Sequence, residues 1–259
     1  MNFTDLYSRG IVPGPDGQSA KAPPIVFFDD FVDGSTHTPG NAAIASSQGK
    51  FSQLANMGTY LVTLIDDNPD NAQTILPADD APGGHVTFTP NNAIADSITC
   101  QANGEAFDLT AGKTVIIEAR ITKTHATTSD WFIGLGKTLG TLVTNSTDFI
   151  GFGNTAGAVD ILAVNGKDCT AGEIADPVAR DEYTFTDTGI DQVAATFNTV
   201  RVEIDGITEA RFYVDGVLKA THTTNLPDDE AMTPSIYTRC TTTTQTGITV
   251  DYILVAQER

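Results

Sequence analysis

The stretch that decides the fold is Thr199 to Thr223, which reads TVRVEIDGITEARFYVDGVLKATHT. From residue 200 to residue 205, valine and isoleucine alternate with charged residues, and this period of two is typical of a half-buried antiparallel strand. Asp205-Gly206 then supplies the positive φ that a tight hairpin turn needs, and Asp215-Gly216 repeats the signal. Two such turns so close together predict a β-meander with no helix between its strands.

The chain from residue 25 onward shows the same style of short apolar runs separated by Gly, Pro, Asn and Asp. Besides the meander, the expected strands cover residues 25–28, 60–65, 85–89, 94–100, 106–109, 113–123, 130–137, 149–154, 159–164, 182–185, 235–238 and 248–256. No long amphipathic helix and no repeat of fixed period interrupts them. The sequence therefore predicts an all-β fold, an antiparallel β-sandwich that forms one domain over residues 25–259.

Residues 1–24 differ from the rest, because they are rich in glycine and proline and contain almost no core material. We expect an extended N-terminal arm that is either disordered or ordered by packing on a neighbouring subunit. The first residues lack the basic and apolar regions of a signal peptide, and no run approaches the ~18 apolar residues of a membrane span. We therefore expect synthesis in a cytoplasm without export by the ordinary route.

The formal net charge of −19 argues against two classes of partner. A field of this sign repels the phosphate backbone of nucleic acids and the surface of anionic membranes, and its simplest role is to keep a threonine-rich β protein soluble. The cysteines Cys100, Cys169 and Cys240 are far apart and form no CxxC pair, which argues against a structural zinc site. Three buried reduced thiols are the simpler expectation, while one disulfide with one free thiol stays open.

Two segments near the C-terminus resemble the concanavalin A-like lectin/glucanase family. They are RFYVDGVLKATHTTNLP, residues 211–227, and the closing strand TVDYILVAQER, residues 249–259. FFDDF, residues 27–31, is similar to the first strand of such domains, and residues 112–137 fit the middle strands. The resemblance implies a jelly-roll form of the β-sandwich over residues 25–259, but it says little about activity, because one fold hosts many functions.

The resemblance also implies what an enzyme of this family would need. Its glycosidases carry carboxylates in a Glu-x-Asp-x-x-Glu pattern on one strand, so that one carboxyl protonates the leaving oxygen while another attacks. The nearest candidates are Glu203 with Asp205, and Glu209 beyond the turn, while Glu118 stands alone on another strand. The turn explains Asp205, and the full pattern is absent. We therefore expect that the protein is not an enzyme.

A polar loop after residue 65 is a candidate calcium site. Asp66, Asn68 and Asp70 have the spacing of the first oxygen ligands in a calcium loop. Asn71 and Pro77 stand where such a loop has its glycine and its bidentate glutamate, so a solvated turn is the simpler interpretation. Calcium is the one cofactor that the sequence leaves open.

Trp131 and Tyr60 are candidates for stacking on a sugar ring, because lectin-type sites use aromatic side chains in this way. A lone tryptophan on an apolar strand is more often part of the core, and this is the competing interpretation. The four histidines are scattered without ligand spacing, which argues against a transition-metal site.

These observations favour a non-enzymatic virion protein of a tailed bacteriophage, above all a capsid decoration or head-fibre protein. The resemblance extends to phage structural components, which often combine this sandwich with a Thr/Asn/Gly-rich sequence and no secretion signal. On this hypothesis the partners are other virion proteins and further copies of the chain, held through residues 1–24. The alternative is a lectin-like module that binds a glycan, for example during host attachment, and a glycoside hydrolase is the third option.

Overall fold

The computed structural model describes residues 25–29, 49–51, 60–65, 73–77, 84–92, 94, 96–102, 104–125, 127–137, 146–154, 158–169, 182–244 and 246–258. The arm expected over residues 1–24 lies outside the described residues, and so does the loop with Asp66, Asn68 and Asp70. The division of the chain into an arm and one domain therefore stays a prediction, as does the calcium site.

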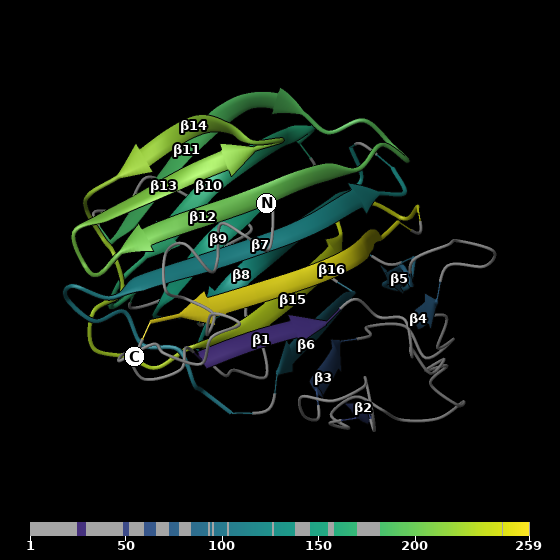
Figure 1. The fold of residues 1–259 in the computed structure, drawn as a ribbon. Helices are drawn as coiled ribbons and strands as arrows, with labels where there is room; N and C mark the ends of the chain where they lie inside the picture. The colour runs from purple at the N-terminus through teal and green to yellow at the C-terminus, as the bar shows by residue number, and fades with distance from the viewer. Residues whose placement is uncertain are drawn as a thin grey trace.

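The described strands form two antiparallel sheets that lie face to face as the layers of a β-sandwich (Figure 1), which confirms the predicted all-β architecture. Sheet A has the strand order β14-β13-β12-β7-β16-β5-β4, with β1 paired to β16. Its strands are β14 (Val217–His222), β13 (Glu209–Val214), β12 (Asn198–Asp205), β7 (Thr114–Lys123), β16 (Ile248–Gln257), β5 (Val86–Thr89), β4 (Thr74–Pro77) and β1 (Ile25–Asp29). Sheet B has the order β11-β10-β9-β8-β15-β6-β3-β2. Its strands are β11 (Tyr183–Asp191), β10 (Asp160–Gly166), β9 (Phe149–Asn154), β8 (Ser129–Gly136), β15 (Thr233–Cys240), β6 (Ser97–Ala102), β3 (Tyr60–Ile65) and β2 (Gly49–Phe51).

The predicted meander is confirmed, because β12, β13 and β14 are neighbours in sheet A. In the first connection Asp205 pairs with Glu209, and Gly206 between them has a φ of 58°. In the second connection Asp215 has a φ of 49° and Gly216 a φ of 78°. Positive φ at both central residues belongs to the type I′ hairpin, whose twist matches that of the flanking strands.

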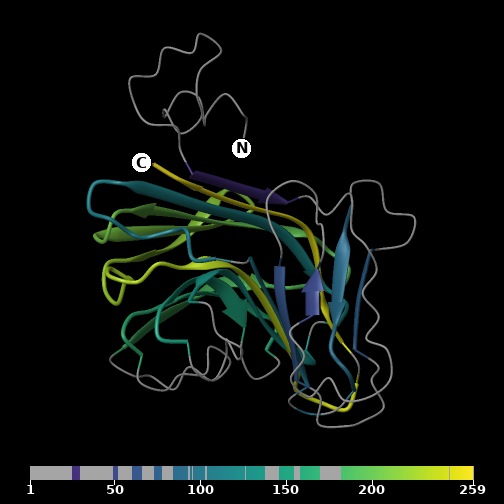
Figure 2. The ribbon, with the colours of Figure 1, turned by 90° about the horizontal axis from the view of Figure 1, so that it is seen from below.

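The C-terminal strand β16 lies inside sheet A and joins three other strands. It pairs with β7 along one edge, while the other edge pairs first with β5, at residues 248–250, and then with β1, at residues 253–257. A register shift between Val250 and Tyr252 separates the two halves. Figure 2 shows β1 beside β16 in the same layer. The expectation that the terminal strand is paired inside a sheet is therefore confirmed.

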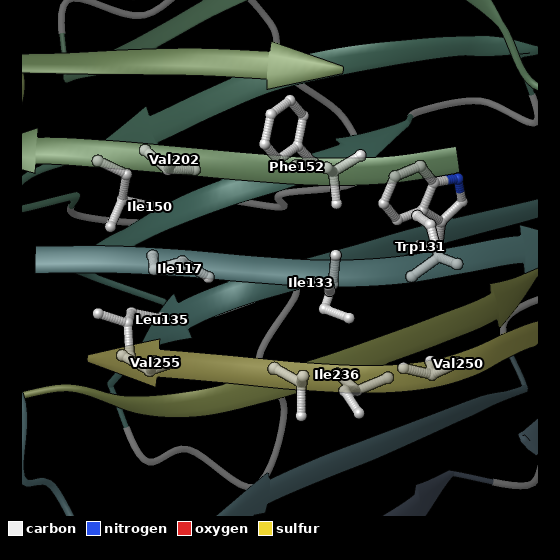
Figure 3. Close-up of a cluster of buried hydrophobic side chains, with 14 of the residues drawn as sticks. Ile117, Trp131, Ile133, Leu135, Ile150, Phe152, Val202, Ile236, Val250 and Val255 are labelled. Carbon is white, nitrogen blue, oxygen red and sulfur yellow. The ribbon is translucent and has the colours of Figure 1, made fainter. Parts of the chain in front are cut away.

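The main core fills the space between the two sheets (Figure 3). Ile117, Val202 and Val255 reach into it from sheet A, and Ile133 and Phe152 reach into it from sheet B. Because successive strand residues point to opposite faces, the residues between these positions lie on the outer face of each sheet. The two outer faces are therefore where strand residues could meet a ligand.

Four segments depart from the expected strands. Residues 106–109 do not form a strand, and only Phe107 makes an isolated bridge, to Met232. Strands β2 and β4 lie at sheet edges and were not expected, because segments of three and four residues do not show a period of two in the sequence. β11 continues to Asp191, well beyond residue 185, although the Asp and Gly residues of its second half are typical of turns.

The cysteines Cys100, Cys169 and Cys240 are free and buried, which confirms the expectation of reduced thiols. Burial raises the pKa of Cys169 to about 12, so its reactive thiolate form is scarce at neutral pH. None of the described residues forms a helix with the length and hydrophobicity that a membrane span requires.

Candidate functional site

One row of side chains crosses the outer face of sheet A, and we call it the cross-strand row. Its members are direct cross-strand neighbours on adjacent strands: Phe28, Leu254, Glu118, Arg201, Tyr213 and Leu218. Phe28, Leu254, Glu118, Arg201 and Tyr213 face outward, because residues next to them in their strands belong to the main core. Leu218 shares this face as the cross-strand partner of Tyr213. Phe28 at one end is 46% exposed and Leu218 at the other is 50% exposed. The row therefore has apolar ends and a charged centre.

The centre of the row is held together by Glu203, which lies next to it on β12. Oε1 of Glu203 accepts a hydrogen bond from Nη2 of Arg201, and Oε2 lies 3.8 Å from Nη2 of Arg211. The hydroxyl of Tyr213 lies 3.5 Å from the same Oε2, and the guanidinium carbon of Arg201 lies 6.0 Å from the centroid of the Tyr213 ring. These contacts fix the orientation of an aromatic ring on the outer face.

Two further groups extend this polar surface along β7 and β16. The hydroxyl of Tyr252 donates to Oε1 of Glu118 at 2.9 Å. Burial and the negative charge of Glu118 raise the pKa of Tyr252, so the hydroxyl keeps its proton and acts as a donor. Asp251 lies 2.5 Å from Nη1 of Arg120 and 3.3 Å from Nε2 of His85. Aromatic rings and ionic side chains thus lie next to one another on this face.

The carboxylates on this face are engaged by neighbouring cationic and hydroxyl groups. A glycosidase needs one carboxyl group free to give a proton and a second free to attack. Glu118 and Glu203 lie on neighbouring strands of one face, but each is only 7% exposed, and both oxygens of Glu203 face cationic or hydroxyl groups. Of the other acids weighed from the sequence, Asp205 is the last residue of β12, directly before the turn, and Glu209 pairs with Arg211 at 3.3 Å.

The outer face of sheet B has the opposite character, since its centre is apolar and buried. A second group of buried side chains, which we call the outer cluster, covers it: Phe132, Phe149, Leu162, Val164, Cys169 and Tyr237. The rings of Phe132 and Phe149 meet edge to face at 6.1 Å. Asp130 at the end of this face is fully buried and accepts hydrogen bonds from Nε and Nη2 of Arg239, at 3.2 and 2.7 Å.

A group of three carboxylates lies beyond the outer cluster. Oxygens of Asp148, Asp168 and Asp229 lie within 4.8 Å of one another, which is close enough for a shared divalent cation. Asp148 is buried, and its burial, with the negative charges of Asp168 and Glu230, raises its pKa. One oxygen of Asp148 already accepts a hydrogen bond from the backbone N–H of Asp168 at 3.3 Å. This group does not include the residues of the predicted calcium loop.

The two aromatic residues predicted to bind sugar are not brought together. Trp131 lies on β8 with 1% of its surface exposed, and Figure 3 shows its indole among the side chains of the main core. Stacking on a sugar requires an accessible ring face, so this burial favours the core interpretation. Tyr60 begins β3, which is separated from β8 by two strands, and its backbone pairs with Ala102. A role for either residue in binding a glycan stays a prediction.

The cross-strand row was not anticipated from the sequence, although its acidic members were considered. The arginines and tyrosines that surround Glu118 and Glu203 alternate with core residues in strands that were correctly expected. What joins them is the register of five strand pairs, which links Phe28 near one end of the chain to Tyr213 and Leu254. The signal that could have identified them is the outward parity of Arg201 and Tyr213 within the meander.

Comparison with known proteins bears on the fold. No family model matches the chain, and no curated protein matches its sequence. Among solved structures, the chain is similar to an endo-1,3-β-glucanase from Streptomyces sioyaensis, with a TM-score of 0.52 and 17% identity over 93% of this chain and 99% of that chain. It is also similar to a β-glucanase from Bacillus licheniformis, with a TM-score of 0.49 and 11% identity over 89% and 97% of the two chains. A third is the carbohydrate recognition domain of Emp46p, with a TM-score of 0.46 and 8% identity over 76% and 87%.

The likeness to the Streptomyces sioyaensis enzyme spans nearly all of both chains, but at this sequence identity it establishes the fold alone. Two antiparallel sheets packed face to face, with the strand from the C-terminus inside sheet A, agree with it. The protein thus has the concanavalin A-like jelly-roll fold, as the segments at 211–227 and 249–259 indicate.

Proposed function

We propose that the protein is a non-catalytic carbohydrate-binding domain that holds a glycan on the outer face of sheet A. The observation that carries the proposal is the cross-strand row, in which partly exposed apolar and aromatic side chains flank a centre of ionic groups. Apolar faces of sugar rings pack on aromatic side chains, while their hydroxyls exchange hydrogen bonds with carboxylate and guanidinium groups.

The dimensions and rigidity of this face support the proposal. Adjacent strands lie about 4.8 Å apart, so a row across six strands extends about 24 Å, which is long enough for several sugar rings. Arg201 and Glu203 hold the Tyr213 ring in place, so little conformational entropy is lost when a ligand binds. The fold is shared with an endo-1,3-β-glucanase, which makes β-glucans the first class of glycan to test.

Calorimetric titration of the full chain with β-1,3-glucan oligosaccharides, followed by a wider glycan array, tests the proposal. We expect Tyr213→Ala to weaken binding by about tenfold, because it removes a fixed aromatic ring from the cross-strand row. Phe185→Ala is the matched control, since Phe185 is an aromatic residue with 41% exposure on sheet B, and its loss should leave affinity unchanged. Equal effects of the two substitutions, or no binding to any glycan, would refute the assignment.

Hydrolysis is the competing function on the same face, because Glu118 and Glu203 lie on neighbouring strands. An assay for newly formed reducing ends separates the two functions. We expect no release of reducing ends from β-glucans that bind. Release that disappears in Glu203→Gln would show instead that the protein is a glycoside hydrolase.

The virion role inferred from the sequence stays a prediction. Its anchoring element would be residues 1–24, which lie outside the described residues, and the similar structures named above do not link the chain to a bacteriophage. The solution mass of the full chain, compared with that of a chain starting at Ile25, is the direct test. An oligomer that becomes a monomer on truncation would support assembly through the arm, and a glycan-binding surface is compatible with it.

A further inference from the structure

The edges of the two sheets meet at one histidine. His222 is the last residue of β14, the edge strand of sheet A, and it is 3% exposed. Its Nδ1 lies 2.5 Å from Oδ1 of Asn165 on β10, and its Nε2 lies 2.9 Å from Oγ1 of Thr186 on β11. Both partners belong to sheet B, so one imidazole ring bridges the two sheets where β14 and β11 lie side by side (Figure 1).

A small network extends this bridge to the segment after β14. Nδ2 of Asn165 donates to the carbonyl oxygens of Thr224 at 2.9 Å and Asn225 at 2.6 Å. Nδ2 of Asn225 donates to Oγ1 of Thr184 on β11 at 3.2 Å. We call this set of contacts, from His222 to Thr184, the polar seam. It fastens the end of β14 and the following turn to both β10 and β11.

The hydrogen bonds of the polar seam determine which ring nitrogen carries the proton in the neutral histidine. Because the amide nitrogen of Asn165 donates to two carbonyls, its oxygen is the atom that faces the ring. Nδ1 of His222 therefore carries the proton and donates to that oxygen, while Nε2 accepts a hydrogen bond from Thr186. A second proton on Nε2 would reverse the hydrogen bond to Thr186, whose hydroxyl can also accept, and would place a positive charge inside the protein, which is the cost of protonation.

No compensating charge faces the ring among the described residues that contact it. On β13 its neighbours are Phe212, whose ring centroid lies 4.6 Å away, and Ala210, its cross-strand partner. On β10 and β11 they are Asn165 and Thr186, and the adjacent Asp187 is exposed and lies on the opposite face of its strand. Burial lowers the pKa of His222 to about 4, as expected for a cation without a counter-charge.

We propose that the polar seam is an acid-sensitive latch, in which protonation of His222 releases β14 and the turn after it from β10 and β11. The central strands of both sheets stay folded, because apolar packing and continuous strand pairing hold them. The released state exposes the ring to water, where its pKa returns to the ordinary range, and this difference drives the opening as the pH falls.

Hydrogen–deuterium exchange of the full chain tests the latch. With ring pKa values of about 4 when closed and about 6.5 when open, the equilibrium constant for opening should rise about 20-fold between pH 7 and pH 5. After correction for intrinsic exchange rates, protection should fall by that factor in the peptide that covers 217–226, which contains β14 and the turn after it. Protection in β7 and β12 should change much less.

Two variants assign the effect to the histidine. His222→Gln removes the titrating ring, so the fall in protection between pH 7 and pH 5 should disappear. His125→Gln is the matched control, because His125 is exposed in the connection between β7 and β8, and this variant should behave like the native chain.

Three results would overturn the proposal. The first is an equal pH-dependent loss of protection in His222→Gln, and the second is loss of protection in all strands together. The third comes from the native protein and holds even if His222→Gln does not fold. An NMR titration in which the His222 ring titrates near 6.5, as an exposed histidine does, would show that the closed seam does not exclude the proton.

Discussion

The two outer faces of the sandwich differ in how much of their outward side chains is exposed to solvent. On sheet A, outward residues such as Arg201, Tyr213 and Leu218 are partly exposed, and the inward residues of the same strands are core. On sheet B, all residues of β8 and β9 are buried, so the outward Phe132 and Phe149 form a second apolar cluster instead of a surface.

This difference predicts that one face contributes mainly to stability and the other mainly to recognition. Side chains buried on both faces of β8 and β9 contribute to the free energy of unfolding through apolar burial and close packing. Partly exposed side chains on sheet A, such as Arg201 and Tyr213, contribute little to that free energy, because they remain near water. Substitutions on sheet A should therefore affect ligand binding, whereas substitutions on sheet B should affect folding.

The largest expected effect comes from truncating the outer cluster. Phe132→Ala should lower the free energy of unfolding by about 4 kcal/mol, because it removes a fully buried ring and leaves a cavity beside Phe149 and Tyr237. Tyr213→Ala on sheet A should lower it by about 1 kcal/mol or less. Guanidinium unfolding of both variants is the measurement. Similar losses in the two variants would mean that the two faces do not divide their roles as proposed.

The contact between β8 and β9 gives the next largest effect. A Cβ on Gly134 would lie 2.2 Å from the carbonyl oxygen of Ile150 and 2.7 Å from Cα of Gly151. Because these are backbone atoms that cannot move aside, Gly134→Ala should cost about 3 kcal/mol of unfolding free energy.

Gly189→Ala on β11 is the control for this effect. Its added methyl group would meet no atom within 4 Å, although its φ of 67° is unfavourable for alanine. This variant should lose only about 1 kcal/mol, the cost of the left-handed backbone. If it loses as much as Gly134→Ala, the backbone approach of β8 and β9 is not what selects glycine there.

The same difference explains what could be predicted from the sequence. The meander and the outward position of Glu203 follow from alternation, because strands with one wet face show a clear period of two. In β8 the residues of both faces are buried, so the sequence pattern leaves two roles open for Trp131. The structure favours the core role, because it places the indole in the main core.

Contacts between residues far apart in the chain could not be predicted in the same way. The cross-strand row depends on the pairing of β1 with β16 and of β16 with β7, which local patterns do not specify. The polar seam joins His222 to Asn165. From the sequence alone, a histidine or an asparagine at the end of a strand would be assigned to a turn or to the surface. The sequence thus predicts elements and faces, whereas the register that assembles a site requires the structure.

A smaller effect, a gain in the free energy of unfolding instead of a loss, is expected when a buried carboxylate beside the outer cluster is replaced. The pKa of Asp148 is raised in the folded protein, chiefly by burial, so the folded state disfavours the ionised form. Native stability is therefore reduced as the pH rises through this pKa, and Asp148→Asn should be more stable than the native protein at pH 7. The gain should vanish below about pH 4, where the unfolded chain also binds the proton.

On sheet A the carboxylate of Glu203 is paired with arginines, so Glu203→Gln should lose stability at pH 7 where Asp148→Asn gains it. Thermal unfolding of both variants at pH 7 and pH 3.5 measures these signs. A loss of stability in Asp148→Asn at pH 7 would mean that the buried carboxylate is stabilised by its neighbours and not penalised by burial.

The smallest expected effect is the coupling between Arg201 and Glu203. Their side chains are 20% and 9% exposed, so the pair is neither fully screened by water nor fully desolvated. A double-mutant cycle with Arg201→Met and Glu203→Gln should give a coupling free energy of about 0.5–1 kcal/mol, and 1 M salt should reduce it. A coupling several times larger and insensitive to salt would place this pair among the groups that stabilise the fold. The cross-strand row would then resemble the buried face of sheet B more than a surface kept for a ligand.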